Sequence, residues 1–190
     1  MARKGLELIM NQYLLYFFII SFVIFIISIN WTTVMGAPYL PTRLAKVKRM
    51  LELADISHDD VVYDLGSGDG RIVIMAAKKY GARGVGVEID PLRYFWSLFL
   101  KLIFGVNKQV KIYRRDFFKI DLSDATVITT FLLEETNFEL IEKLGNELKP
   151  GTKIIANHFE FPRWLLVDEY KDVYVYEIQG PKDPSKVGRK

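Results

Sequence analysis

Cysteine is absent from the 190-residue chain, and histidine occurs only twice, as His58 and His158. Without cysteine, the protein has no disulfide scaffold, thiolate metal site or cysteine nucleophile. Two histidines are too few for a histidine-rich metal site, so we expect no bound metal. A large excess of charge is missing too, because the formal net charge is only +3. A nucleic-acid-binding domain usually carries a denser basic stripe, and we therefore expect no nucleic-acid partner.

Charged residues are also missing from a long N-terminal segment, between Glu7 and Arg43. Within this segment, residues 13–29 are almost entirely apolar and have no polar face, unlike an amphipathic surface helix. Roughly 20 apolar residues span a bilayer, and residues 8–31 supply that length. We therefore predict a single transmembrane anchor that contacts membrane lipid, rather than a cleaved signal peptide or a buried core helix.

Basic residues on the two sides of this segment predict its orientation. Arg3 and Lys4 precede it, and a richer set follows it, namely Arg43, Lys46, Lys48 and Arg49. The positive-inside rule then predicts a single-pass protein of the cell membrane whose C-terminal domain is cytoplasmic. We divide the chain into a membrane anchor (1–37), a folded domain (38–180) and a flexible basic tail (181–190).

Strand and helix patterns alternate after the anchor. A helix over 43–54 is predicted first, with Thr42 as its cap. Strands are then predicted over 61–65, 84–89, 110–114, 125–130, 153–157 and 173–178, and helices over 71–79, 91–104 and 136–148. Strands separated by helices indicate an α/β fold with a mostly parallel sheet and flanking helices.

A glycine-rich loop, Gly66-Ser67-Gly68-Asp69-Gly70, follows the first predicted strand. Its glycines allow a tight turn and a close approach of the backbone to a ligand. Glu88 ends the next strand, where a carboxylate can accept both ribose hydroxyls of an adenosine. The spacing matches neither a dinucleotide-binding loop nor a phosphate-cradling loop, and Asp64 and Asp69 would repel a pyrophosphate. These residues favour a cationic nucleoside ligand.

Three motifs in order resemble class I S-adenosylmethionine-dependent methyltransferases: residues 64–70, Val85-Gly86-Val87-Glu88 and Arg115-Asp116-Phe117. The resemblance covers roughly residues 38–179 and implies a Rossmann-like fold. It also implies S-adenosylmethionine as cofactor, a ligand that carries a sulfonium and an ammonium but no phosphate. The glycine loop would contact the methionine part, Glu88 the ribose and Asp116 the adenine amino group. The predicted cofactor-binding residues are Tyr39, Asp64, Gly66, Gly68, Gly70, Glu88, Asp116 and Phe117.

Residues 38–42, 124–133 and 159–164 are similar to segments of small archaeal protein-lysine methyltransferases. They also resemble mitochondrial, membrane-anchored lysine methyltransferases that modify a c-subunit of ATP synthase. The resemblance implies that Tyr39 lies over the cofactor near its methyl group, and that the acceptor is a protein lysine at or near the membrane. A lysine amine must lose its proton before attack, and an apolar opening lowers its pKa by desolvation. The predicted catalytic residues are Tyr39, Phe131, Glu134, His158 and Trp164, with Glu135 as a further polar candidate.

Two alternatives remain open from the sequence. The acceptor could be a lipid amine or a membrane-soluble small molecule, or the chain could be a non-catalytic cofactor-binding membrane subunit. The nucleobase class is disfavoured, because its members usually carry Asn/Asp-Pro-Pro-Tyr/Phe where this chain has residues 129–133, Thr-Thr-Phe-Leu-Leu.

The predicted helix over 91–105 is unusually apolar, because Arg93, Ser97 and Lys101 are its only polar side chains. We expect this helix to contact lipid or the anchor through Trp96, Phe99 and Phe104, with Arg93 and Lys101 directed toward lipid headgroups.

Overall fold

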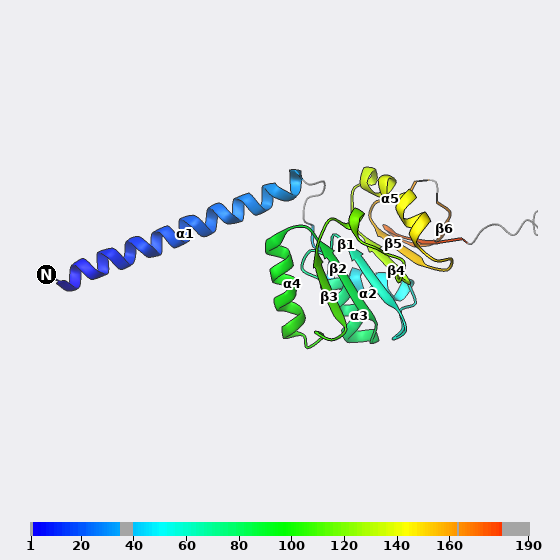
Figure 1. Ribbon diagram of the computed structural model, residues 1–190, viewed down its shortest axis with the longest axis horizontal. Helices are drawn as coiled ribbons and strands as arrows, with labels where there is room; N and C mark the ends of the chain where they lie inside the picture. Colours follow the sequence, from blue (N-terminus) through cyan, green and yellow to red (C-terminus); the bar gives the residue numbers. More distant parts are fainter. Residues whose placement is uncertain (1, 35–39, 163, 180–190) are drawn as a thin grey trace, which may run out of the picture. The chain divides into compact units, whose positions relative to one another are not determined.

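The computed structural model describes residues 2–34, 40–162 and 164–179, and the chain forms two units, Met1–Tyr39 and Leu40–Lys190. The first unit contains one helix, α1 (Ala2–Val34, Figure 1). Apolar side chains at its described positions are exposed, such as Tyr13, Phe17 and Phe22. The predicted helix is therefore confirmed. The predicted span over residues 8–31 has no support, because no helix in the described part of the chain is long and apolar enough to cross a membrane.

The second unit is a seven-stranded sheet in the order β3-β2-β1-β4-β5-β7-β6. Strands β1 to β5 are parallel, and β7 runs antiparallel to both of its neighbours, β5 and β6. The predicted class I, mostly parallel α/β fold is confirmed. The strands are β1 (Val61–Leu65), β2 (Arg83–Glu88), β3 (Val110–Arg114), β4 (Val127–Thr130), β5 (Lys153–Asn157), β6 (Leu166–Tyr170) and β7 (Val173–Glu177). The helices are α2 (Leu44–Leu53), α3 (Arg71–Tyr80), α4 (Pro91–Ile103), the short 3₁₀ helix η1 (Phe117–Lys119) and α5 (Glu134–Glu147).

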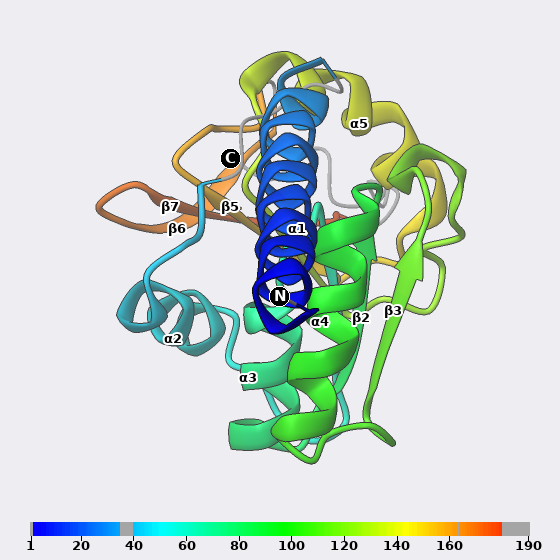
Figure 2. The same cartoon turned by 90° about the vertical axis from the view of Figure 1, so that its left-hand side faces the viewer.

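Helices cover both faces of the sheet, because the central strands β1, β4 and β5 are buried on both sides. Alternate residues of a strand point to opposite faces. In β1, Tyr63 packs in one core cluster with Leu140 and Leu144 of α5, whereas Val62 packs in another with Val47 of α2 and Ile72 of α3. Helix α4 packs on β2 and β3. It lies next to α3, on the side away from α2 (Figure 2). The carboxyl ends of the parallel strands are left for a ligand.

Two local predictions were wrong or incomplete. Thr42 does not cap α2: Arg43 occupies the N-cap position without a side-chain hydrogen bond, and the Thr42 hydroxyl instead accepts a hydrogen bond from Asn157 Nδ2 (3.0 Å). Strand β6 was not predicted. It is an edge strand whose residues are largely exposed and include Asp168 and Glu169, so it lacks the alternating apolar pattern that marks a half-buried strand.

Helix α4 buries Ser97 of its polar stripe, leaves Arg93 and Lys101 half-buried, and exposes much of its apolar face. Ser97 is 0% exposed, and Lys101 donates a hydrogen bond to the carbonyl of Val110 (3.1 Å), so the prediction that Lys101 reaches lipid headgroups was wrong. Trp96, Phe99 and Phe104 are 53%, 49% and 44% exposed. Ser97 packs directly against the glycine loop, because a Cβ added to Gly70 would lie 3.3 Å from the Ser97 Cβ. The inward side of α4 therefore packs on the loop, and the described residues of this unit leave its apolar side largely uncovered.

Replacing Gly84 with alanine is expected to lower the free energy of unfolding by about 1–3 kcal/mol. Helix α3 lies directly on β2 here, and an added Cβ would lie 2.8 Å from the Val73 Cβ and 2.9 Å from the Val73 carbonyl oxygen. Gly145 provides the matched control, since it lies inside α5 with nothing within 4 Å of an added Cβ. Gly145→Ala should stabilise by about 0.5–1 kcal/mol. Denaturant unfolding of both variants measures the difference, and equal effects would contradict the packing argument.

Candidate active site

The glycine loop lies at the point where the order of the sheet reverses. The chain runs from β1 outward through β2 to β3 and then returns to β4 on the other side of β1, which leaves a crevice at the strand ends. Gly66, Gly68 and Gly70 have φ values of 78°, 56° and 78°, in the left-handed region that favours glycine. The backbone N–H groups of Gly66 and Ser67 donate to the carbonyl of Val87 (2.9 and 3.0 Å), which holds the loop against β2.

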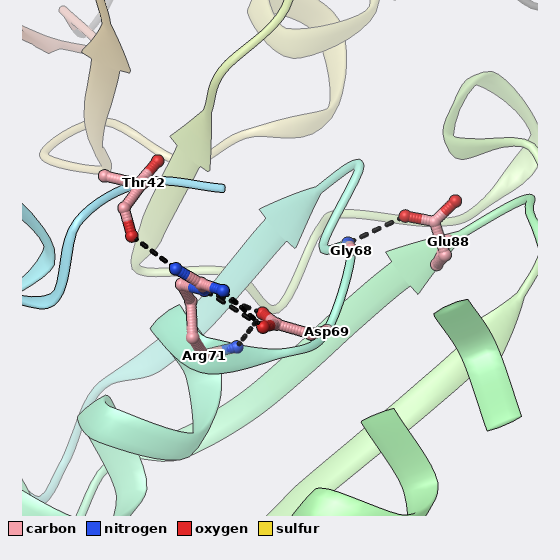
Figure 3. A network of polar contacts seen from close by, with 5 residues as sticks. All are labelled: Thr42, Gly68, Asp69, Arg71 and Glu88. Carbon is pink, nitrogen blue, oxygen red and sulfur yellow. Dashed lines mark hydrogen bonds and ion pairs between the residues drawn. The ribbon is translucent and has the colours of Figure 1, made fainter. Parts of the chain in front are cut away.

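Glu88 is buried at the end of β2 and is held by two backbone donors. Gly68 N–H donates to Oε2 (2.7 Å, Figure 3), and Asp90 N–H donates to Oε1 (2.8 Å). Burial raises the pKa of Glu88, and these two hydrogen bonds oppose that change. Each carboxylate oxygen retains a second lone pair, so the side chain can still accept hydrogen bonds from the hydroxyls of a ligand. Its orientation is fixed before any ligand binds.

Asp64 is buried at the end of β1, where it accepts a hydrogen bond from Thr129 Oγ1 (2.7 Å). Burial raises its pKa to about 7, the Thr129 hydrogen bond opposes this, and the charges of Asp69 and Glu88 raise it further. A positively charged ligand would relieve this clustering of acids by favouring the ionised carboxylate. The electrostatics of the loop therefore suit a cation.

Arg71 joins the glycine loop to the segment that enters α2. Its Nε and Nη2 atoms bind the carboxylate of Asp69, with Nη2–Oδ2 at 2.5 Å, and its Nη1 donates to the carbonyl of Thr42 (2.7 Å, Figure 3). Sequence reasoning missed this clamp and also missed Asp90 and Thr129. The sequence contained a signal for Asp90, since Asp before Pro at a helix start is an N-cap pattern, and its side chain accepts from Arg93 N–H. No such signal existed for Thr129, whose partner depends on the register of β1 with β4.

Asp116 lies just beyond the end of β3, next to the end of β2. Arg115 N–H donates to the carbonyl of Glu88 (3.2 Å), which places the start of this loop beside Glu88. Asp116 caps η1 by accepting from Phe118 N–H (3.0 Å), and Phe117 packs partly buried against the core. The predicted ribose and adenine residues thus lie at the ends of adjacent strands.

The predicted catalytic residues fall in three places. Phe131 and His158 follow β4 and β5, and their rings lie 6.4 Å apart in an edge arrangement. Glu134 lies in the exposed first turn of α5 together with Glu135, where the helix dipole favours a carboxylate. Trp164 stacks on Phe161 (5.1 Å between centroids) at the edge of the core, and no described contact joins it to Phe131 or His158. Tyr39 lies outside the described residues.

Some of the buried polar atoms without a partner come from residues at the strand ends. Within the described part of the chain they include Ser67 Oγ, Thr130 Oγ1 and Asn157 Oδ1, which come from the ends of β1, β4 and β5. Leaving such a group unpaired costs about 1–3 kcal/mol, so each of these atoms would gain from a hydrogen bond to a bound molecule. The acids, the pre-positioned Glu88 and the glycine turns fit S-adenosylmethionine in charge and in hydrogen-bonding groups.

Comparison with known proteins agrees with this geometry. The family model of the ANTKMT methyltransferase domain matches residues 64–168, more than half of the chain. A protein-lysine N-methyltransferase of Saccharolobus islandicus is 48% identical over 128 residues, 67% of this chain and 80% of that protein. A Xenopus laevis lysine N-methyltransferase named for the c-subunit of ATP synthase is 36% identical over 128 residues, but the chain spans only 56% of its length.

A solved structure gives the same assignment for the fold and the cofactor. It is described as an RNA methyltransferase from Salinibacter ruber in complex with S-adenosyl-L-homocysteine, with 43% identity and a TM-score of 0.73 over 76% of this chain and 98% of that one. The glycine loop, the acidic strand ends and these similarities lead to one assignment. The chain belongs to the family of the ANTKMT methyltransferase domain and is a class I S-adenosylmethionine-dependent methyltransferase.

Proposed function

We propose that this enzyme methylates lysine side chains of proteins at or near a membrane. The observation that supports lysine as the acceptor is the 48% identity to the Saccharolobus islandicus protein-lysine N-methyltransferase. The chain covers 80% of that protein. S-adenosylmethionine supplies a methyl carbon activated by the sulfonium, and the electron pair of the broken carbon–sulfur bond stays on sulfur. The protein must position the amine, exclude water and remove a proton from the amine.

The strand ends next to the glycine loop suit an amine acceptor on a long side chain. Phe131 directly follows β4, and the rings of Phe131 and Phe159 lie near the His158 ring, with centroids 6.4 and 4.8 Å from it. Aromatic walls reduce the hydration of an incoming ammonium and so favour its neutral form. They can also pack against the methylene groups of a lysine. Together these groups support a lysine as the acceptor.

An RNA acceptor is the competing proposal, because the Salinibacter ruber protein is described as an RNA methyltransferase. The residues after β4 disfavour it for this chain. Phe131, Leu132 and Leu133 provide no side-chain donor or acceptor for the edge of a base, and base readout depends on such groups. A lipid amine is a third possible acceptor.

Transfer of a labelled methyl group separates these acceptors. The enzyme is incubated with isotopically labelled S-adenosylmethionine and a cell extract that retains its membranes, and label is measured in protein, lipid and RNA. We expect label in protein, at lysines identified by mass spectrometry. Glu88→Ala provides the inactive control, because it removes the predicted ribose acceptor. Label confined to lipid or RNA would overturn the lysine proposal, and label in no fraction would favour a non-catalytic role.

We further propose that α1 and the apolar face of α4 attach the enzyme to the cell membrane, with the catalytic unit on the cytoplasmic side. The exposed apolar side chains of α1 support attachment, and the basic residues that follow α1 support the orientation. Fully burying one large apolar side chain is worth about 1.5–3 kcal/mol relative to leaving it in water. The exposed face of α4, which includes Trp96, Phe99 and Phe104, would therefore gain several kcal/mol from contact with lipid.

Removing residues 1–31 is expected to weaken binding to lipid vesicles, and replacing Trp96, Phe99 and Phe104 with serine in the shortened protein should abolish it. Flotation with vesicles measures both effects. The triple variant should keep the melting temperature of the shortened protein within a few degrees, because these side chains are exposed. Phe161→Ser is the control. Phe161 is fully buried, so its truncation should lower the free energy of unfolding by about 3–5 kcal/mol. Unfolding of the triple variant, or no flotation of the full chain, would contradict the attachment proposal.

A further inference from the structure

The turn between β6 and β7 holds the residue that follows β5. His158 N–H donates to the carbonyl of Asp172 (2.6 Å), and His158 Nδ1 lies 3.3 Å from Asp172 Oδ2. Lys46 of α2 forms an ion pair with the same carboxylate oxygen at 2.6 Å. Three segments that are far apart in the sequence thus meet at one side chain, and the His158 ring is oriented through its Nδ1 side.

The backbone is strained on both sides of this contact. Among the described residues, three non-glycine residues have a positive φ, and two of them are His158 (72°) and Lys171 (57°). Lys171 and Asp172 form a two-residue turn, closed by the pairing of Tyr170 with Val173. A lysine with positive φ in such a turn, and a histidine with positive φ after a strand, each cost about 1–3 kcal/mol. Strain of this kind persists where the surrounding structure over-determines it, and it clusters at functional sites.

His158 lies at the edge of the sheet where the acceptor is expected. It follows β5, which pairs with β4, and its ring contacts those of Phe131 and Phe159 at 6.4 and 4.8 Å between centroids. The side chain is 56% exposed, so a substrate can reach it. The ring makes its polar contact through Nδ1, and no described residue forms a hydrogen bond with Nε2.

We infer that His158 is the base that accepts the proton of the substrate ammonium, and that Asp172, anchored by Lys46, is the positioning residue that orients it. This inference rests on the proposed amine acceptor. Asp172 accepts the Nδ1–H hydrogen bond, which leaves the lone pair of the neutral imidazole on Nε2. Nε2 takes one proton from the ammonium, and the lysine nitrogen keeps the lone pair that bonds to the methyl carbon. The exposed ring then releases the proton to water.

The charges around the dyad support this arrangement. The pKa of Asp172 is lowered, first by its hydrogen bond to Lys46 and also by its hydrogen bond to His158, while slight burial opposes the change. Asp172 therefore stays a carboxylate. The other cations near the turn, Arg49 and Lys171, lie over the ring of Tyr170 at 4.6 and 5.4 Å. Within the described residues, the Asp172 carboxylate forms an ion pair with Lys46 and a hydrogen bond with His158.

The kinetic test uses His158→Asn and Asp172→Asn in the full chain, because asparagine tolerates a positive φ. The substrate is a peptide that carries the lysine identified in the labelling experiment. We expect kcat to fall by about 10²-fold or more for His158→Asn, with loss of the acidic limb of its pH profile. Asp172→Asn should lower kcat by about tenfold or more. The affinity for S-adenosylmethionine and the melting temperature should stay unchanged, which excludes simple unfolding.

The second histidine of the chain provides the matched control. His58 also contacts a carboxylate, Asp59 at 3.4 Å, but both side chains are highly exposed and His58 precedes β1, at the opposite end of that strand from the glycine loop. His58→Gln should leave kcat and the pH profile unchanged. The same variant assigns the ¹⁵N NMR signals of the two histidines, because the signals that it loses belong to His58. In these spectra, His158 should show an Nδ1–H signal in the neutral ring, and Asp172→Asn should reduce that signal.

These readouts separate the inference from the proposed function. If the enzyme labels no protein lysine but the Nδ1–H signal depends on Asp172, the acceptor proposal fails and the orientation of His158 by Asp172 stands. Unchanged kcat and an unchanged pH profile in His158→Asn would overturn the assignment of His158 as the base. An Nδ1 signal that does not respond to Asp172→Asn would overturn the positioning role.

Discussion

Replacing Glu88 with alanine is expected to lower the affinity for S-adenosylmethionine by at least about 100-fold. The carboxylate is buried at the end of β2 and oriented by the N–H groups of Gly68 and Asp90. Hydrogen bonds to a charged group are worth about 1.5–3 kcal/mol each, and two ribose hydroxyls would lose their acceptor. Two such losses amount to a factor of about 10² or more in the dissociation constant.

Glu88→Gln is a sharper version of this experiment. Both carboxylate oxygens accept a backbone N–H, so one of them must be replaced by an NH₂ group that faces a donor. The amide therefore disturbs the glycine loop or the start of α4, although its size and shape are those of glutamate. We expect an affinity for S-adenosylmethionine that is well below that of the wild type.

Isothermal titration with S-adenosylmethionine measures both Glu88 variants. Asp116→Ala serves as a comparison and should have a smaller effect, because Asp116 is partly exposed and already caps η1. Thermal unfolding without ligand reports any damage to the fold. An unchanged dissociation constant in a folded Glu88→Ala protein would refute the ribose role.

The affinity for S-adenosylmethionine is expected to rise with pH up to about 7 and to level off above it. The pKa of Asp64 is about 7 in the free protein, because burial disfavours its charge and the neighbouring Asp69 and Glu88 add repulsion. A ligand with a sulfonium and an ammonium favours the carboxylate and so lowers this pKa when it binds. Binding then releases a proton below pH 7, and the affinity at pH 6 should be about tenfold lower than at pH 8.

Asp64→Asn removes the titrating group but keeps the shape of the side chain and an acceptor for Thr129 Oγ1. We expect a low affinity that no longer depends on pH between 6 and 8. Titration calorimetry in two buffers of different ionisation enthalpy counts the released protons. S-adenosylhomocysteine, which lacks the sulfonium charge, shows how much of the effect comes from that charge. A wild-type affinity independent of pH would refute the role of Asp64.

The Asp64 carboxyl group also affects the stability of the folded protein. Its pKa in the folded protein lies above the ordinary value of 3.8, so its contribution to stability is fully present below about pH 4 and is lost as the pH rises toward 7. Without ligand, Asp64→Asn should therefore melt at a higher temperature than the wild type at pH 8. A buried acid that costs stability until a cation arrives is typical of a binding site rather than of a structural core.

The sequence by itself determined the α/β class, the helix α1 and most of the elements of the second unit. Strong periodic patterns and glycine punctuation carry that information locally, and β1, β3 and β5 form at the predicted residues. The glycine loop and Glu88 were found for the same reason, since close backbone approach and an acid at a strand end require particular residue types at fixed positions. Strand β6 was missed because an exposed edge places few constraints on its side chains.

Only the tertiary structure decided which distant groups meet. Thr129 lies beside Asp64 through strand register, and Arg71 reaches both Asp69 and Thr42. Asp172 meets His158 and Lys46 because the β6–β7 hairpin folds back beside β5. Helix α4 shows the difference most clearly. Its sequence reveals one polar stripe, and only the packing of Ser97 under the glycine loop shows that this stripe faces inward. A local pattern specifies an element and its faces, whereas the direction of a face depends on what the rest of the chain packs against it.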